Sequence, residues 1–246
     1  MKINVILKKE DIERDKLSDN HLIIVLDILL ATSTIVSMLE HGAKKILPVT
    51  SEMEALSLWR TQQEDSPLLV GEQEGYGLEK FLSPNPLLLR EKVKGRSVIL
   101  LTTNGTVAIR TVAGFPHVYV GSLLNGRALA QEVYKNYRHI RTIQIICSGS
   151  SNQFCMEDFY GAGFVINELL QTFDSSLLEL TDSARSSYLF YNFFATTEEG
   201  ERILQSSQVG KLLNQLHYGK VISYVNSRNI YTIVPKLSEK KLILKN

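Results

Sequence analysis

The segment that decides the fold is HLIIVLDILLATSTIVSML, residues 21–39. It opens with six mostly apolar residues, which is typical of a strand buried on both faces, and this run ends at Asp27. From residue 31 the apolar side chains recur with helical spacing instead. The helical face consists of Ala31, Ile35, Met38 and Leu39. The segment therefore predicts a buried strand followed directly by a helix.

The same alternation continues to about residue 170. Five further apolar runs predict strands at Lys45–Val49, Pro67–Val70, Ser97–Leu101, His117–Val120 and Thr142–Cys147. A second helical face consists of Phe159, Ala162, Ile166 and Leu169. Strands that alternate with helices predict an α/β fold with a mostly parallel or mixed sheet and helices on both faces.

The pattern changes after residue 174. Residues Asp182–Phe194 and Glu199–Asn214 have helical spacing, whereas Val221–Val225 and Ile230–Val234 leave the type of element undecided. The basic, apolar tail Lys236–Asn246 predicts one edge strand. We expect a single compact unit over residues 1–246, of one or two lobes, with a motif-bearing part at 1–174 and a more divergent part at 175–246.

Composition narrows the choice of partners. The 246 residues carry a formal net charge of +1, so no long-range field attracts nucleic acid or an anionic membrane, and we expect neither as a partner. The chain has no apolar run near 18 residues, no signal-like start and only two cysteines, which favours the cytoplasm. An anionic ligand would have to be held by local groups.

The strand ends carry the candidate site. In open α/β sheets, ligands bind beyond the carboxyl ends of the strands. Five predicted strand ends here carry small hydroxyl, amide or carboxylate residues. The polar segments are Asp27 with Ala31–Thr34, Gly71–Gly75, Thr102–Thr106, Gly121–Asn125 and Cys147–Ser151, the last followed by Glu157 and Asp158.

Each segment also has a purely structural interpretation. Asp27 is a possible helix cap, as is Thr32, and Asn104-Gly105 is a common turn sequence. Glu157 and Asp158 begin a helix, where the macrodipole favours acidic residues. Glu72 is harder to explain this way, because flanking glycines let a ligand approach the backbone. Free amides and hydroxyls at the start of the helix after residue 104 would suit an anionic oxygen.

Other common sites are not indicated. The five histidines are scattered without metal spacing, Cys147 and Cys155 form no zinc motif, and neither nucleotide-binding glycine loop occurs. From the residues alone, the sequence indicates an α/β protein with a polar, acid-bearing ligand site.

The polar blocks together resemble the 2-phosphosulfolactate phosphatase family. The resemblance rests on Asp27-Ile-Leu-Leu-Ala-Thr-Ser-Thr, Gly71-Glu72, Thr102-Thr-Asn-Gly-Thr106, Gly121-Ser122 with Asn125, and Cys147-Ser-Gly149 with Glu157-Asp158 and Gly161-Ala-Gly163. It covers roughly residues 20–170 and, more loosely, 209–235. The resemblance implies a Mg²⁺-dependent phosphatase that converts 2-phosphosulfolactate to sulfolactate and phosphate, a step of coenzyme M biosynthesis in some organisms. It also implies a homodimer.

The resemblance assigns roles to the polar residues. It implies that Asp27 and Asp158 lie at the metal, with Glu157 as a further ligand or as the base, because hard divalent cations prefer carboxylate oxygen. The nucleophile is either water or Asp27 itself. The predicted substrate-binding residues are Thr32, Glu72, Thr103, Asn104, Gly105, Thr106, Ser122, Asn125 and Ser148.

Three departures from the family pattern leave three hypotheses open. Leu30 and Gln73 occupy places where the pattern has arginine, and the stretch 80–86 lacks the usual aspartate. Arginine binds anionic groups through paired, charge-assisted hydrogen bonds that neutral residues cannot replace. Lys80 and Arg127 are candidates to compensate. The protein is then an active phosphatase on the family substrate, a phosphatase for a less anionic substrate, or a catalytically impaired relative that acts as a binding or regulatory protein.

Overall fold

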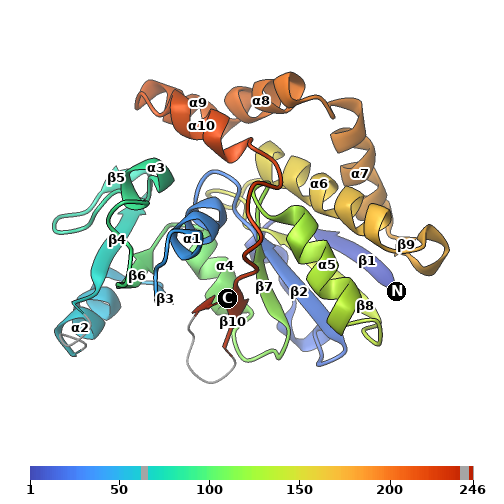
Figure 1. Ribbon diagram of the computed structural model, residues 1–246, viewed down its shortest axis with the longest axis horizontal. Helices are drawn as coiled ribbons and strands as arrows, with labels where there is room; N and C mark the ends of the chain where they lie inside the picture. The colour runs from blue at the N-terminus through green and yellow to red at the C-terminus, as the bar shows by residue number, and fades with distance from the viewer. Residues whose placement is uncertain (62–65, 239–243, 246) are drawn as a thin grey trace.

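The structure is a computed structural model that describes residues 1–61, 66–238 and 244–245. In the described part, one sheet of eleven strands runs through the molecule in the order β5-β4-β6-β3-β11-β10-β7-β2-β8-β1-β9 (Figure 1). The strands are β1 (Lys2–Ile6), β2 (His21–Leu26), β3 (Lys45–Val49), β4 (Leu68–Gln73), β5 (Tyr76–Gly77), β6 (Ser97–Leu101), β7 (Val118–Gly121), β8 (Thr142–Cys147), β9 (Glu179–Leu180), β10 (Lys236–Leu237) and β11 (Leu244–Lys245). Pairings that involve β5, β10 or β11 are antiparallel, and the others are parallel.

Helices cover both faces of the sheet. The α-helices are α1 (Ala31–Glu40), α2 (Glu52–Thr61), α3 (Pro86–Leu89), α4 (Gly105–Thr111), α5 (Gly126–Asn136), α6 (Met156–Thr172), α7 (Asp182–Phe193), α8 (Thr197–Ser206), α9 (Gln208–Gln215) and α10 (Gly219–Val225). In β2, Leu22, Ile24 and Leu26 belong to a core shared with α5, α6 and α7. Ile23 and Val25 belong to the core on the other face, with α1 and α4. This two-sided burial explains why the strand is a continuous apolar run, and it confirms the predicted fold class.

Most of the predicted strands are confirmed closely. The bounds of β2, β3, β6 and β8 are as predicted, β4 begins one residue later and continues to Gln73, and β7 is shifted by one residue. The sequence reasoning missed β1, which pairs in parallel with β8. Only Ile3 and Val5 of this strand are buried, so its apolar pattern is short.

The C-terminal part differs from the prediction in two respects. The helix expected at Glu199–Asn214 is two helices, because Ser207 adopts an extended backbone and its hydroxyl accepts a hydrogen bond from the Gly210 amide at the start of α9. Val221–Val225 lies in α10, whereas Ile230–Val234 forms neither helix nor strand.

The predicted edge strand at Lys236–Asn246 is wrong. Its described residues form β10 and β11, an antiparallel pair in the middle of the sheet rather than at its edge. Lys236 pairs with Tyr119 of β7 and Leu244 with Ile46 of β3, so the pair joins the two parallel halves. Leu237 is buried there. Residues 239–243 and 246 of the predicted strand lie outside the described residues.

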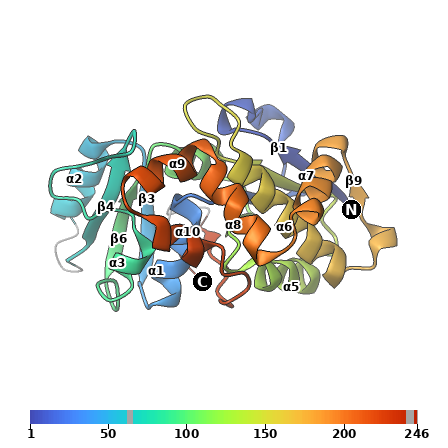
Figure 2. The same cartoon turned by 90° about the horizontal axis from the view of Figure 1, so that it is seen from above.

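Helices α8, α9 and α10 form a group that lies beside the sheet, and Figures 1 and 2 together place α9 and α10 over α1. This group contacts α6 through α8. In the described part of the chain, no helix is both long and apolar enough to cross a bilayer.

Candidate active site

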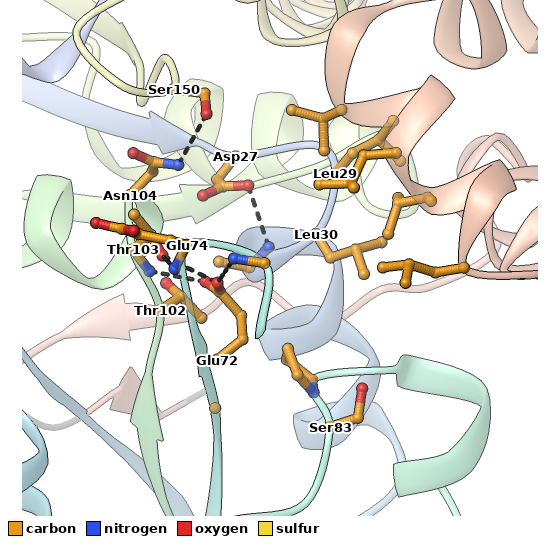
Figure 3. A pocket seen from close by; sticks show the side chains of 18 of the residues that line it. Asp27, Leu29, Leu30, Glu72, Glu74, Ser83, Thr102, Thr103, Asn104 and Ser150 are labelled. Atoms are coloured by element: carbon orange, nitrogen blue, oxygen red, sulfur yellow. Dashed lines mark hydrogen bonds between the residues drawn. The ribbon is translucent and has the colours of Figure 1, made fainter. Parts of the chain in front are cut away.

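Four of the predicted site residues line one cavity of about 440 Å³ at the carboxyl ends of the strands. Asp27 follows β2, Glu72 lies near the end of β4, and Thr103 and Asn104 follow β6 (Figure 3). Ser150 and Ser151, after β8, complete the polar side. Loops from neighbouring strands therefore converge, as the α/β topology predicts.

Asp27 has both a structural contact and a free face. Its Oδ1 accepts a hydrogen bond from the Ala31 amide at 3.2 Å, so the carboxylate helps to start α1. Its Oδ2 lies against Gly105, where an added Cβ would be 2.7 Å from this oxygen. Burial raises the pKa of Asp27 to about 7; the Ala31 hydrogen bond lowers it, and the charges of Glu72 and Glu157 raise it further. Capping alone does not account for this buried acid.

Glu157 and Asp158 lie behind Asp27 at the start of α6, and both are buried. Asp158 accepts hydrogen bonds from the Ile28 amide at 2.8 Å and the Gly149 amide at 3.1 Å. Burial raises the pKa of both acids, and for Asp158 the charges of Asp27 and Glu157 add to the effect. Neither acid has a basic partner among the described residues. A helix dipole favours exposed acids, but it does not explain why two adjacent acids are buried.

Glu72 fixes the loop after β6. Its Oε1 accepts a hydrogen bond from the Thr103 amide at 2.8 Å, and its Oε2 accepts from the Thr103 hydroxyl at 2.9 Å and the Gly75 amide at 2.7 Å. The Thr103 hydroxyl also accepts from the Glu74 amide. Glu72 is thus a scaffold acid at the rim of the cavity, although sequence reasoning placed it against the substrate.

Asn104 contacts a lysine that sequence reasoning missed. Asn104 is the N-cap residue of α4, but its side chain makes no capping hydrogen bond to this helix. Instead, its Oδ1 accepts from Lys9 Nζ at 2.9 Å, and its Nδ2 faces Ser150 Oγ at 3.4 Å (Figure 3). Lys9 stands in a charged run near the start of the chain. The only sequence signal for it would have been recognition of β1, whose carboxyl end reaches this edge of the sheet.

The other predicted binding residues lie outside the cavity lining, and most of their polar groups bond within their own loops. The Thr32 hydroxyl bonds the backbone of Asp27, and Thr106 bonds Thr102. The Asn125 side chain accepts a hydrogen bond from the Ser122 amide and donates one to the Ile233 carbonyl. The Ser122 hydroxyl accepts one from the Leu124 amide. Gly105 allows the close approach to Asp27 already described. Ser148 is buried, and its hydroxyl has no hydrogen-bond partner among the described residues.

The opposite side of the cavity is apolar. It is formed by the loop after β2, by Pro84, by α9 and by Leu216 directly after this helix; Leu29 and Leu30 of the loop are labelled in Figure 3. The apolar residues that line it are Leu29, Leu30, Pro84, Val209, Leu212, Leu213 and Leu216. No lysine or arginine is among the described residues that line the cavity.

Comparison with known proteins gives a consistent result over the whole chain. The sequence model of the 2-phosphosulpholactate phosphatase family matches residues 6–240. The chain belongs to this family. It is 31% identical over 245 residues to a probable 2-phosphosulfolactate phosphatase from Clostridium acetobutylicum, covering 99% of this chain and 100% of that protein. A protein of the same name from Carboxydothermus hydrogenoformans is 32% identical over 248 residues, covering 100% and 98% of the two chains.

Leu30 and Gln73, the two positions where we expected arginine from the family resemblance, differ in their surroundings. Leu30 lines the cavity as part of its apolar side, whereas Gln73 is exposed and outside the lining. Neither expected substitute fills the gap. Lys80 is exposed, and Arg127 pairs with Glu168 at 3.5 Å; neither lines the cavity.

The donor set suits a hard cation held by few protein ligands. Among the described residues, no three histidine, cysteine or acidic side chains are arranged as a complete metal cage. Mg²⁺, however, commonly binds one or two carboxylates and completes its shell with water and substrate phosphate. Asp27 provides one buried carboxylate on the cavity, and the charges of Glu157 and Asp158 behind it are not offset by a basic residue. These residues fit a magnesium ion at Asp27.

Proposed function

We propose that this protein is a Mg²⁺-dependent phosphatase that hydrolyses 2-phosphosulfolactate to sulfolactate and phosphate. The observation that carries the proposal is the buried Asp27 carboxylate, which opens onto a cavity lined by Thr103, Asn104 and Ser150. The proposal follows the name of the relatives, which are probable 2-phosphosulfolactate phosphatases. It places the protein in the cytoplasm, acting on a small anionic phosphomonoester, and in coenzyme M biosynthesis where an organism makes that coenzyme.

The residues of the cavity have distinct tasks under this proposal. Hydrolysis of a phosphomonoester depends mainly on positioning and on stabilising charge over the transferring oxygens. The Asn104 amide and the Ser150 hydroxyl are donors for these oxygens, and Glu72 holds the loop that carries Thr103 and Asn104. Asp27 orients the attacking group or attacks phosphorus itself.

Asp27 would also hold the magnesium ion, with Glu157 and Asp158 adding negative charge next to it. When bound, the ion supplies positive charge to the phosphate and lowers the pKa of a bound water. The buried acids then contribute to function, since without a cation they only raise one another's pKa.

The decisive experiment measures phosphate release from 2-phosphosulfolactate by the purified protein, with Mg²⁺ and with EDTA. We expect turnover that stops on chelation and that falls by at least about 10³-fold in Asp27→Asn, the scale of removing a group essential to phosphoryl transfer. The matched control is the Asp19→Asn variant, because Asp19 is an exposed acid outside the cavity. A folded protein that releases no phosphate from any phosphomonoester would refute the proposal and favour a binding role.

One observation favours a second candidate function, the hydrolysis of a less anionic phosphomonoester. 2-Phosphosulfolactate carries a phosphate, a sulfonate and a carboxylate, yet one side of the cavity is apolar and includes Leu30 and the leucines of α9. An apolar wall cannot replace the solvation that a sulfonate or carboxylate would lose. A substrate with one phosphate and an apolar remainder would match both sides of the cavity.

A substrate panel separates the two candidates. Phenyl phosphate has one anionic group, so the second candidate predicts a higher kcat/KM for phenyl phosphate than for 2-phosphosulfolactate. The Leu30→Arg, Gln73→Arg double variant should reverse this preference. If the wild-type protein already favours 2-phosphosulfolactate and the double variant does not improve on it, the second candidate is excluded.

A further inference from the structure

The cavity needs a source of positive charge and of hydrogen-bond donors. Among its described lining residues, Asp27, Glu72 and Glu74 are acidic and none is basic. A bound phosphate therefore meets a negative surface, apart from the ion proposed at Asp27. Lys9 is a basic residue directly behind the lining, because its ammonium donates a hydrogen bond to the lining residue Asn104.

Lys9 reaches the site from the carboxyl end of β1. It follows β1 in a short 3₁₀ turn (Lys9–Asp11), and its backbone amide donates to the Ser148 carbonyl at 3.2 Å, which ties the turn to the end of β8. Its side chain is only 10% exposed. The ammonium donates to Asn104 Oδ1 at 2.9 Å and pairs with Glu10 Oε1 at 2.7 Å. A lysine this well buried is held in a defined position.

The contact fixes which face of the Asn104 amide meets the cavity. A lysine ammonium has three donors and no acceptor, so it can only take the oxygen of the amide. The Nδ2 donor is then turned the other way, toward Ser150 and the cavity (Figure 3). A phosphate oxygen requires a donor, and a reversed amide would present an acceptor and repel it.

We propose that Lys9 is a positioning residue of the phosphate site, which orients the Asn104 amide as a donor and places a positive charge behind it. This inference rests on the proposed function. It predicts an effect on phosphate binding that is larger than the effect on the chemical step, because Lys9 acts through Asn104 rather than on the reacting atoms. Glu10 competes for the same ammonium in the free protein.

The neighbouring lysine provides a matched control. Lys8 Nζ bonds Asn152 Oδ1 at 2.6 Å and lies 3.7 Å from Asp11, away from the cavity lining. Lys9→Met and Lys8→Met remove the same charge from adjacent positions and keep the aliphatic chain. Lys9→Arg keeps a side chain that only donates, and Glu10→Gln removes the competing carboxylate.

Binding of inorganic phosphate in the presence of Mg²⁺ is measured by titration calorimetry, and KM and kcat by phosphate release. We expect Lys9→Met to raise the Kd for phosphate and KM about tenfold or more, with a smaller change in kcat. Lys9→Arg should recover most of this loss, Lys8→Met should change Kd less than about twofold, and Glu10→Gln should tighten binding. A structural role would instead lower the melting temperature without this division between KM and kcat.

Two kinds of failure are distinguishable. If the wild-type protein hydrolyses a phosphomonoester but Lys9→Met matches Lys8→Met, or loses kcat with an unchanged Kd, the role of Lys9 is refuted and the proposed function stands. If the wild-type protein neither binds phosphate nor hydrolyses a phosphomonoester, both proposals are refuted.

Discussion

Substituting Asp27 by asparagine should make the metal-free protein more stable and less active. The carboxylate is 8% exposed, and its pKa is raised from 3.8 to about 7, chiefly by burial. Asparagine has the same shape, and its oxygen can still accept the Ala31 hydrogen bond. The substitution therefore removes a buried charge with little change in packing.

The size of the effect follows from the pKa. The rise of the Asp27 pKa from 3.8 to about 7 corresponds to about 4 kcal/mol. We treat this value as an upper bound, because burial also raises the pKa of Glu157 and of Asp158 and the charges of these acids interact with that of Asp27. The folded protein binds a proton at Asp27 that the unfolded chain has already lost above pH 4. The free energy of unfolding of the wild type therefore falls as pH rises, by up to about 1.4 kcal/mol per pH unit between pH 4 and pH 7, and levels off above pH 7.

Urea unfolding of wild type and Asp27→Asn in EDTA, from pH 5 to pH 8.5, measures this directly. Glu157 and Asp158 remain in both proteins, so the difference between the two curves reports Asp27 together with its charge interactions with these two acids. We expect the free energy of unfolding of the variant to exceed that of the wild type increasingly as pH rises, by about 2 to 4 kcal/mol above pH 7. Asp19→Asn, at an exposed position, should show no such trend. A difference that is independent of pH, or a variant less stable than wild type at pH 8, would refute the electrostatic argument.

Three further predictions concern the same region. Added Mg²⁺ should raise the melting temperature of the wild type above pH 7 but not that of Asp27→Asn, because a ligand of the folded state stabilises it by mass action; equal shifts would place the metal elsewhere. Gly105→Ala should cost about 1–3 kcal/mol and about 10²-fold in turnover, because its Cβ would collide with Ala31 and Asp27. Gly219→Ala, whose Cβ would make only an ordinary contact of 3.5 Å with Asn214 Oδ1, should be neutral in activity. Ser207→Ala should cost about 1 kcal/mol in urea unfolding through loss of the α9 cap, and Ser206→Ala, whose hydroxyl bonds only the Ile203 carbonyl, should cost less.

The sequence predicted the central strands well because their signal is local. A strand such as β2 is buried on both faces, so five of its six residues are buried and apolar and its bounds are visible. In β1 only two of five residues are buried, and the strand is defined by its partner β8 rather than by its own pattern. Similarly, β10 and β11 have two described residues each, and these strands are defined by their pairing with β7 and β3 rather than by their own pattern.

The polar strand ends were predicted as a group, but their individual roles were not. Asn104 and Asn125 both follow a strand and precede a helix, and nothing in the local sequence separates them. In the structure Asn104 faces the cavity, whereas Asn125 bonds Ser122 and the Ile233 carbonyl. The distinction depends on which segment packs beside each loop, which is a tertiary property.

The origin of the two sides of the cavity explains why family membership does not determine the substrate. The acids of the site lie directly after β2, in β4 and at the start of α6, inside the motif-bearing part of the chain. The divergent part contributes Val209, Leu212 and Leu213 of α9 and Leu216 directly after it. Under the proposed function, the motifs determine the phosphate side of the cavity, and α9, which carries no motif, forms with Leu29 and Leu30 the side that meets the rest of the substrate. Substitutions in α9 should then change which phosphomonoester is preferred while Mg²⁺ dependence is retained. Comparing kcat/KM for phenyl phosphate and 2-phosphosulfolactate in Leu216→Lys would test this division, and equal losses on both substrates would contradict it.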